Sequence, residues 1–241
     1  RATSSGSCRA SHRSFVTVKL ATIAQRPRPF GVDLRASWGG WAMPSLQVTI
    51  LTALLMGVLY TLVPEGRWRQ LGKLVVTEFV SLDGVMEAPG GEPEFKYPGW
   101  SFEFDRGDDG NQFKLDETRQ ADGLLIGLRT YESFAGAWPE REGEFAEKFN
   151  AMPKFVVSRT LEDPQWNNTT VLDSGDATAQ VRKLKEEFDG ELQVPGSHRL
   201  VQELIESDLV DQINLMVFPV ILGTGKKAFE EKPERRNLRL K

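Results

Sequence analysis

The pattern of hydrophobic and polar residues changes near residue 73, where predicted strands begin to alternate with predicted helices. Runs rich in β-branched and apolar residues predict strands at 73–82, 123–127 and 153–158. Apolar residues at helical spacing predict helices at 176–188 and 197–207. This alternation predicts an α/β domain with a mostly parallel sheet flanked by helices.

The part before residue 73 has a different character. Residues 1–44 mix Ser, Arg, Pro and Gly without periodicity, which predicts a poorly ordered extension. Residues 45–63, SLQVTILTALLMGVLYTLV, carry no charge. A helix of that length spans roughly 28 Å, enough to cross a hydrocarbon core. Three interpretations stay open: a membrane anchor, a hydrophobic helix packed on the body, or upstream sequence outside the working protein.

Charge and composition narrow the kinds of function. The chain has a net charge of −4, which divides into +7 for residues 1–72 and −11 for residues 73–241. An acidic body argues against nucleic-acid binding, because phosphate neutralisation needs a basic face. One cysteine and two histidines exclude a multi-cysteine or His-rich metal site. A small-molecule ligand and a cytoplasmic location are therefore expected, unless residues 45–63 anchor the chain in a membrane.

Three predicted strands end on residues that are suited to bind phosphate. Glycines, hydroxyls and cations occur where the strands end, and they are Gly127, Arg129, Thr130, Ser158, Arg159, Gly196 and Ser197. The carboxyl ends of parallel strands form the usual ligand-binding edge of an open sheet. Each turn alone also fits an ordinary strand–helix connection. Together they indicate separate contacts to an extended phosphate ligand such as a dinucleotide, although no Gly-x-Gly-x-x-Gly motif follows the first strand.

Four segments then resemble one family in order and spacing. They are KLVVTEFVSLDGVMEAPGG, LLIGLRTYESFAGAWP, MPKFVVSRTL and LVQELIESDLVDQINLMVFPVILGTGKKAF. Together they resemble bacterial proteins of the dihydrofolate reductase-like superfamily. The nearest likeness is to small stand-alone relatives of the reductase domain of the bifunctional riboflavin-biosynthesis deaminase/reductase. The resemblance covers residues 73 to about 240 and does not reach residues 1–70.

The resemblance implies a mixed sheet and an NADPH-dependent reductase. Its substrate would be a small heterocyclic compound, pyrimidine- or pteridine-like, or a carbonyl compound. By position, Gly127, Arg129 and Thr130 resemble an element that approaches the cofactor phosphates. Ser158 and Arg159 resemble the element beside the adenosine 2′-phosphate, and Gly196 with Ser197 resembles the pyrophosphate-binding turn. Residues Ser81, Asp83 and Gly84 resemble the loop that covers nicotinamide and substrate.

The chain departs from the family pattern at two places of consequence. Leu128 stands where the family usually has arginine, and Arg129 and Arg159 are the cations that could compensate. The chain also stops at LRLK, before a last β-strand that family members have, so an unpaired sheet edge is expected. Both departures favour an alternative function, a catalytically inactive reductase-like module for binding or assembly.

Candidates for the reacting centre are few. Asp83 is the predicted catalytic residue, although SLDG is also a good turn by composition. Asp109 and Asp116 lie on the predicted helix that carries the substrate-binding acid in dihydrofolate reductase. Trp100 is a candidate for the wall of the substrate pocket, with core packing as its alternative. Glu78, in the first strand, either faces the pocket or is exposed.

A long apolar strand near the end of the domain predicts self-association. The segment DQINLMVFPVIL is followed by no covering strand, and exposed apolar edges tend to be paired. A homodimer is therefore predicted, with Leu215, Val217 and Val220 near the contact. The alternative is a central strand that the chain's own helices bury.

Overall fold

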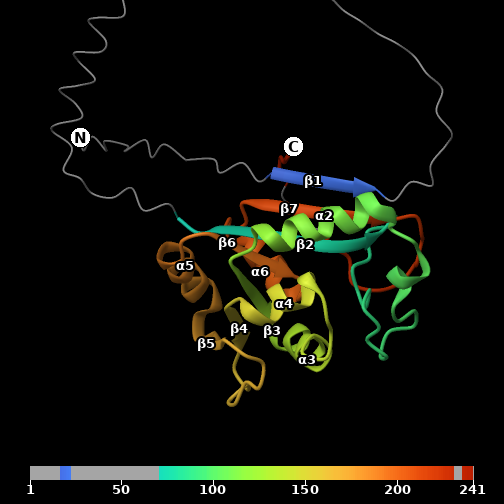
Figure 1. Cartoon of the computed structure of the whole chain (residues 1–241). Coiled ribbons are helices and arrows are strands. Elements are labelled where there is room, and N and C mark those ends of the chain that lie inside the picture. Colours follow the sequence, from blue (N-terminus) through green and yellow to red (C-terminus); the bar gives the residue numbers. More distant parts are fainter. Residues whose placement is uncertain (1–16, 23–70, 231–234, 241) are drawn as a thin grey trace, which may run out of the picture. The chain divides into compact units, whose positions relative to one another are not determined.

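The computed structural model describes residues 17–22, 71–230 and 235–240 (Figure 1). The hydrophobic segment 45–63 lies outside these residues, as does all of 1–44 except 17–22. Among the described helices, none is both long enough and apolar enough to span a membrane.

Strands and helices alternate along the described chain, as the pattern predicted. The strands are β1 (Thr17–Thr22), β2 (Lys73–Ser81), β3 (Gly123–Gly127), β4 (Lys154–Ser158), β5 (Thr169–Asp173), β6 (Glu191–Pro195), β7 (Gln212–Phe218) and β8 (Arg239–Leu240). The α-helices are α2 (Gly107–Gln120), α3 (Leu128–Ala137), α4 (Glu144–Ala151), α5 (Ala177–Glu187) and α6 (His198–Glu206). Short 3₁₀ turns occur at Trp100–Glu103 and Ser174–Asp176.

The described strands form one sheet in the order β5-β4-β3-β6-β2-β7-β1-β8. Each strand pairing in this part of the chain is parallel. An antiparallel contact occurs as an isolated bridge between Val85 and Lys227. The predicted α/β fold with a mostly parallel sheet flanked by helices is therefore confirmed.

Both faces of the sheet are covered, because successive side chains of a strand point to opposite faces. Leu74, Val76 and Val194 belong to a buried cluster with residues of α5 and α6. Leu124 and Ile126 belong to a second cluster, with residues of α3 and α4. Near-continuous apolar strands are what a parallel sheet covered on both faces requires.

Strand β1 corrects two expectations about the sheet edge. It runs parallel to β7, from Thr17 opposite Gln212 to Thr22 opposite Val217, and β8 pairs with its other side. Residues 17–22 are thus a strand within a segment that was predicted to be poorly ordered. The β7 edge, predicted to be unpaired, is paired, because its free N–H and C=O groups offer a template for another strand.

Leu215 on β7 is a core residue. Its side chain is 8% exposed and packs in the cluster shared with α5 and α6. The alternative reading of this strand, as one buried by the chain's own helices, therefore fits Leu215. The homodimer itself stays a prediction.

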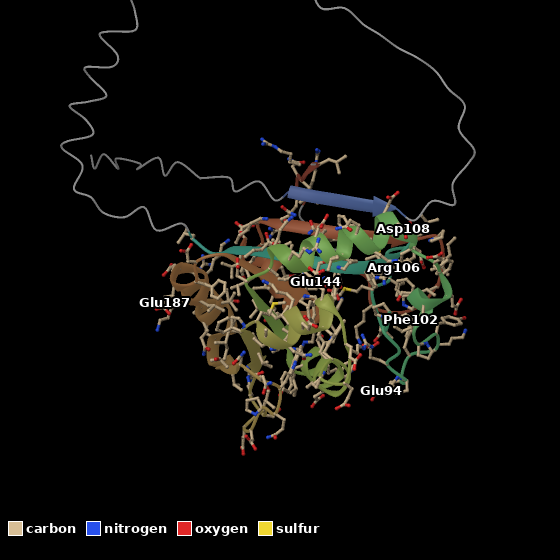
Figure 2. The ribbon with its side chains drawn as sticks, viewed as in Figure 1. Glu94, Phe102, Arg106, Asp108, Glu144 and Glu187 are labelled. Carbon is tan, nitrogen blue, oxygen red and sulfur yellow. The ribbon has the colours of Figure 1, made fainter. Side chains whose placement is uncertain are left out.

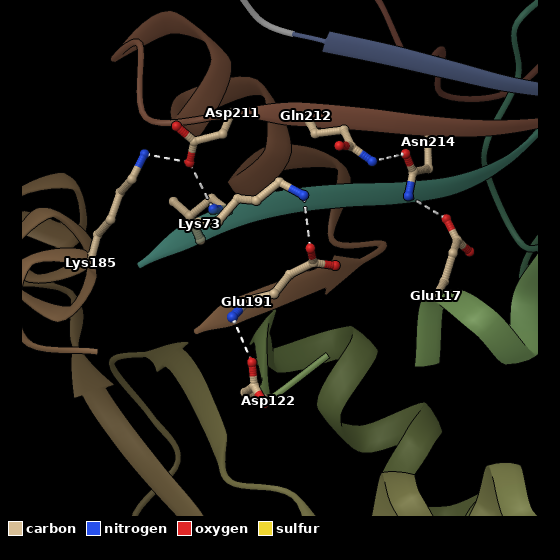
Figure 3. Close-up of polar contacts among 9 residues, drawn as sticks. Lys73, Glu117, Asp122, Lys185, Glu191, Asp211, Gln212 and Asn214 are labelled. Atoms are coloured by element: carbon tan, nitrogen blue, oxygen red, sulfur yellow. Dashed lines mark hydrogen bonds and ion pairs between the residues drawn. The ribbon is translucent and has the colours of Figure 1, made fainter. Parts of the chain in front are cut away.

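Polar side chains hold the amino ends of the central strands together (Figure 3). Asp211 accepts hydrogen bonds from the Leu74 N–H at 2.8 Å and from Lys185 Nζ at 2.5 Å. Glu191 pairs with Lys73 Nζ at 2.8 Å, and its own N–H donates to Asp122 at 2.9 Å. These contacts fix β2 and β6 as neighbours, and that arrangement positions their carboxyl ends.

Lys154 is a fully buried cation at the start of β4. Its Nζ donates to the carbonyl oxygens of Asn150, Met152 and Asn167 at 2.8–2.9 Å. It also lies 4.4 Å from the centre of the Trp166 ring. Burial lowers the pKa of Lys154 to about 8. The ammonium group joins the end of α4 to the loop before β5.

Candidate functional site

A cavity of about 1220 Å³ lies at the carboxyl ends of β2 and β6 and extends over α2, α3 and α4. Thr77, Glu78 and Phe79 line it from β2, and Pro195, Gly196 and Ser197 line it from the end of β6. The loop between β2 and α2 forms another wall, and Figure 2 shows Glu94 on this loop. The cavity therefore occupies the edge of the sheet where ligands of open α/β folds bind.

Four of the predicted cofactor residues come together at one side of the cavity. The Gly127 N–H donates to Ser197 Oγ at 2.6 Å, and Ser197 Oγ donates to Thr130 Oγ1 at 2.8 Å. Gly196 has a φ of 84°, and a Cβ placed there would lie 3.4 Å from Thr130 Oγ1. Residues Gly127, Thr130, Gly196 and Ser197 are here named the glycine–hydroxyl cradle.

The backbone at Ser197 is in the left-handed region, with φ 69° and ψ 65°. Few residues other than glycine, asparagine and aspartate adopt this conformation at low cost. The two hydrogen bonds of its hydroxyl hold the turn between β6 and α6 in this conformation. Backbone strain of this kind tends to occur at functional sites.

The cation beside the cradle is Arg129. It is exposed, lines the cavity, and lies 3.9 Å from Glu94 across the opening. Leu128, at the start of α3, is partly buried and is not a lining residue of the cavity. The position that departs from the family pattern therefore lies outside the cavity, and the cation comes from the next residue.

The predicted contacts from Ser158 and Arg159 are not part of this cavity. Ser158 is buried, and its Oγ accepts hydrogen bonds from the N–H groups of Thr160 and Leu161, each at 3.1 Å. The hydroxyl thus stabilises the turn after β4. This is the ordinary strand-end role that the sequence had left open.

The predicted catalytic loop also has a structural role. Asp83 accepts hydrogen bonds from Ser81 Oγ at 2.6 Å, from the Leu222 N–H at 3.1 Å and from the Gly223 N–H at 2.8 Å. The Ser81 hydrogen bond, with the two backbone donors, lowers the pKa of Asp83. Asp83 is therefore an ionised anchor between the turn after β2 and the loop after β7. Ser81, Asp83 and Gly84 do not line the cavity.

Trp100 belongs to the core. Its side chain is 1% exposed, its Nε1 donates to the Glu87 carbonyl at 2.8 Å, and its ring meets Phe218 edge-on at 5.2 Å. Phe218 is fully buried, so the indole packs against the end of β7. The structure therefore agrees with the second interpretation of Trp100, in which it packs in the core.

The residues of α2 that face the cavity are not the two predicted acids, Asp109 and Asp116. Asp116 is exposed and accepts a hydrogen bond from Gln112 at 2.7 Å, and neither it nor Asp109 lines the cavity. The lining residues of α2 are Asn111, Lys114 and Leu115. Their i, i+3, i+4 spacing is the signal that could have found this face in the sequence.

Lys114 is held by a buried polar network between α2 and the sheet. Its Nζ lies 2.6 Å from Glu117 Oε2 and donates to Thr77 Oγ1 at 2.7 Å. Glu117 also accepts from Asn214 Nδ2 at 2.5 Å, and Gln212 donates to Asn214 in turn (Figure 3). The network fixes an ammonium group at the α2 side of the cavity.

Glu78 is a buried carboxyl group beside the cradle. Its side chain is 6% exposed and lines the cavity, and its Oε1 accepts the Gly196 N–H at 3.0 Å. Burial raises the pKa of Glu78 to about 8, although the Gly196 hydrogen bond and the Lys114 charge oppose this rise. The sequence allowed Glu78 either to face the pocket or to be exposed, and the structure agrees with the pocket-facing position.

The inner part of the cavity has an amide and an aromatic wall. Gln193 is 1% exposed, and its Oε1 has no hydrogen-bond partner within the described chain. Trp138 stacks on Phe145 at 5.1 Å, and Phe145 stacks on Phe149 at 4.7 Å. Sequence reasoning missed Gln193, because a single glutamine in an apolar strand carries no distinctive spacing.

Fold and cavity together define an α/β domain with a cavity at the carboxyl ends of parallel strands. Residues 72–241 match the family described as the RibD C-terminal domain, and the chain belongs to this family. This confirms the resemblance to the riboflavin-pathway reductase domain that the sequence motifs indicated.

The chain is also similar to individual proteins and solved structures. The uncharacterised protein YyaP of Bacillus subtilis (strain 168) is 26% identical over 173 residues, which cover 70% of this chain and 86% of YyaP. A putative riboflavin biosynthesis protein from Shewanella sp. PV-4 is 21% identical, with a TM-score of 0.53, over 68% of this chain and 86% of that one. RibD from Acinetobacter baumannii is 12% identical, with a TM-score of 0.50, over 69% of this chain and 51% of that one. The two structural likenesses show the fold alone.

Proposed function

We propose that this protein is an NADPH-dependent reductase that transfers hydride to a small heterocyclic or carbonyl substrate. The observation that carries the proposal is the glycine–hydroxyl cradle, which brings Gly127, Thr130, Gly196 and Ser197 together beside Arg129. Membership of a family named for a riboflavin-biosynthesis reductase domain supports the same activity.

The cradle suits a pyrophosphate group. Gly196 has no Cβ at a turn with positive φ, so a ligand can approach its backbone closely. The hydroxyl of Thr130 and the first residues of α6 supply donors, and the positive end of the helix dipole favours an anion there. Arg129 offers a guanidinium fork for the 2′-phosphate that distinguishes NADPH from NADH.

The rest of the cavity suits a substrate. A volume of about 1220 Å³ exceeds what one drug-sized ligand usually fills, so cofactor and substrate fit together. Asn111, Lys114 and Gln193 present polar groups on the α2 side, and the rings of Trp138 and Phe149 form an apolar wall. NADPH, when bound, supplies the hydride; the chain's residues orient both molecules and exclude water.

Titration of the full chain with NADPH and with NADH, followed by cofactor fluorescence, tests the proposal. We expect tighter binding of NADPH, and oxidation of bound NADPH by at least one member of a panel of pyrimidinediones, pterins and carbonyl compounds. Arg129→Ala should reduce the preference for NADPH about tenfold or more, since charge-assisted hydrogen bonds contribute about 1.5–3 kcal/mol. Arg182→Ala, at an exposed arginine of α5 outside the cavity, is the matched control.

The outcomes separate the two functions. Equal affinity for both cofactors would contradict the role of Arg129. Absence of binding would contradict the reductase and favour the alternative of a reductase-like binding module.

A further inference from the structure

One carboxyl group of the cavity has no part in the scheme above. Thr77 of β2 lies opposite Pro195 of β6, so Glu78 comes next to Gly196, where the chain leaves β6 for α6. Its Oε1 accepts the Gly196 N–H, and no described residue donates a hydrogen bond to Oε2. The Lys114 ammonium acts electrostatically on the same carboxyl from α2. Glu78 therefore lines the cavity beside the cradle, next in β2 to Thr77, which contacts Glu117 of α2.

This is the junction at which cofactor and substrate would meet. The cradle side holds phosphate in the proposed function, and the α2 side holds the substrate. Hydride transfer to a C=N or C=O bond also needs a proton for the heteroatom. The donor must lie within reach of both ligands and must carry a proton at neutral pH.

Three other acids, Asp83, Glu117 and Glu87, do not meet these conditions. Asp83 lies outside the cavity, and its three donors favour its ionised form. Glu117 is bound to Lys114, Thr77 and Asn214. Glu87 lines the cavity but is paired with Lys226, and this pairing lowers the pKa of Glu87.

We infer that Glu78 delivers the proton that accompanies hydride transfer, an inference that rests on the proposed function. Hydride, with its electron pair, forms the new C–H bond, and the π bond of the substrate breaks. The heteroatom takes the proton from the Glu78 carboxyl, whose O–H bond breaks. The products are reduced substrate, oxidised cofactor and the Glu78 carboxylate, and water in the cavity returns a proton to Glu78.

The protonation state of Glu78 supports this role. Burial raises its pKa to about 8, so the group is mainly a neutral acid at neutral pH. Charged groups line the cavity from several elements, and the charge that acts on Glu78 is that of Lys114. Lys114 belongs to α2, Glu87 and Lys226 pair with each other on two loops, and His198 of α6 contacts Glu230 at 3.2 Å.

The experiment uses the full chain with Glu78→Gln and, as matched control, Glu203→Gln at an exposed carboxylate of α6 outside the cavity. Glu78→Gln keeps an oxygen that can accept the Gly196 N–H but removes the acid. The infrared band of a protonated carboxyl should be present at neutral pH in the NADPH-loaded protein and absent in Glu78→Gln. Glu203→Gln should retain it.

Kinetics give the second measurement. With an acceptor from the pyrimidinedione, pterin and carbonyl panel, the wild-type rate should fall above the pKa of Glu78. Glu78→Gln should slow NADPH oxidation about 100-fold or more, the usual effect of removing a general acid. NADPH affinity should change less than about threefold, since a neutral amide replaces a neutral acid at the same place. Glu203→Gln should retain the wild-type rate.

The results that would overturn this inference differ from those that would overturn the proposed function. Intact NADPH binding with an ionised Glu78 carboxylate at neutral pH would overturn the inference alone. So would a Glu78→Gln variant with the wild-type rate. If the wild-type chain binds no NADPH, the proposed function fails and this inference fails with it.

Discussion

Ser197 Oγ accepts the Gly127 N–H at 2.6 Å, which ties the end of β3 to the start of α6. The same hydroxyl donates to Thr130 Oγ1 at 2.8 Å, in the first turn of α3. Seventy residues separate Ser197 from Gly127 in the chain. One side chain thus fixes the relative positions of three elements that surround the proposed cofactor site.

Loss of this hydroxyl should weaken cofactor binding. Ser197→Ala leaves the Gly127 N–H without its partner, and an unpaired group of this kind costs about 1–3 kcal/mol. We expect a roughly tenfold or larger loss of NADPH affinity by fluorescence titration. Ser133→Ala, which removes another cavity-lining hydroxyl, should have little effect. Equal losses in both variants would contradict a specific role for Ser197.

Gly127 and Ser197 should also be coupled sterically. A Cβ on Gly127 would lie 3.1 Å from Ser197 Oγ and 3.2 Å from Ser197 Cβ, and no other atom is that close. Gly127→Ala should therefore destabilise the domain by about 1–3 kcal/mol, as overpacking usually does. In the Ser197→Gly background the same substitution should cost less. Chemical denaturation of the four proteins gives the coupling, and additive effects would contradict it.

The sequence predicted the cradle because each of its residues follows a recognisable strand end. The parallel order of β3, β6 and β2 then brings those ends to one edge. Ser158 also follows a strand end, and its hydroxyl accepts hydrogen bonds within its own turn. A residue type at a strand end specifies a turn, and only the strand order decides whether the turn reaches the cavity.

The acids were harder to assign. Asp83 was predicted from the resemblance of its loop to one that covers nicotinamide and substrate. Its oxygens accept hydrogen bonds from Ser81 in its own turn and from Leu222 and Gly223 in the loop after β7. Glu78 is a single acid in a mostly apolar strand. The residues that act on it, Gly196 and Lys114, come from distant segments of the chain, so no local signal in the sequence indicates its role. Strand β1 was missed for a similar reason. Six residues without a flanking pattern become a strand through pairing with β7.

Glu78 should make stability fall as pH rises. Its pKa increases from 4.5 unfolded to about 8 folded, so between these values the folded state holds a proton that the unfolded state has lost. Glu78→Gln should therefore be more stable than wild type by up to about 3 kcal/mol at neutral pH. Below the unfolded pKa of 4.5 both states of the wild type hold the proton, so the difference in stability between the two proteins should become smaller and independent of pH. Denaturation of the two proteins across this pH range checks the prediction.

Lys154 should be essential for stability. Lys154→Met leaves the carbonyl groups of Asn150, Met152 and Asn167 without their common donor in a buried site. A loss of about 3 kcal/mol or more is expected from such unpaired groups. Lys183→Met, at a lysine whose side chain is 73% exposed, should change stability by less than about 0.5 kcal/mol. Similar unfolding midpoints for the two variants would contradict the structural role of Lys154.

The β7 edge should control self-association. In the full chain β1 pairs along β7, with Leu20 opposite Leu215. A fragment of residues 73–241 lacks β1, so its β7 edge is free to pair with a second copy. Light scattering after size-exclusion chromatography should show the fragment more associated than the full chain.

Leu20→Pro in the full chain isolates the backbone contribution, because proline cannot donate a hydrogen bond to the neighbouring strand. It should shift the protein toward the association seen for the fragment. If the full chain already forms the predicted homodimer, and the fragment and Leu20→Pro form the same dimer, the contact lies away from β7. If all three are monomers, the homodimer prediction fails, and the buried position of Leu215 is then explained by the chain's own helices alone.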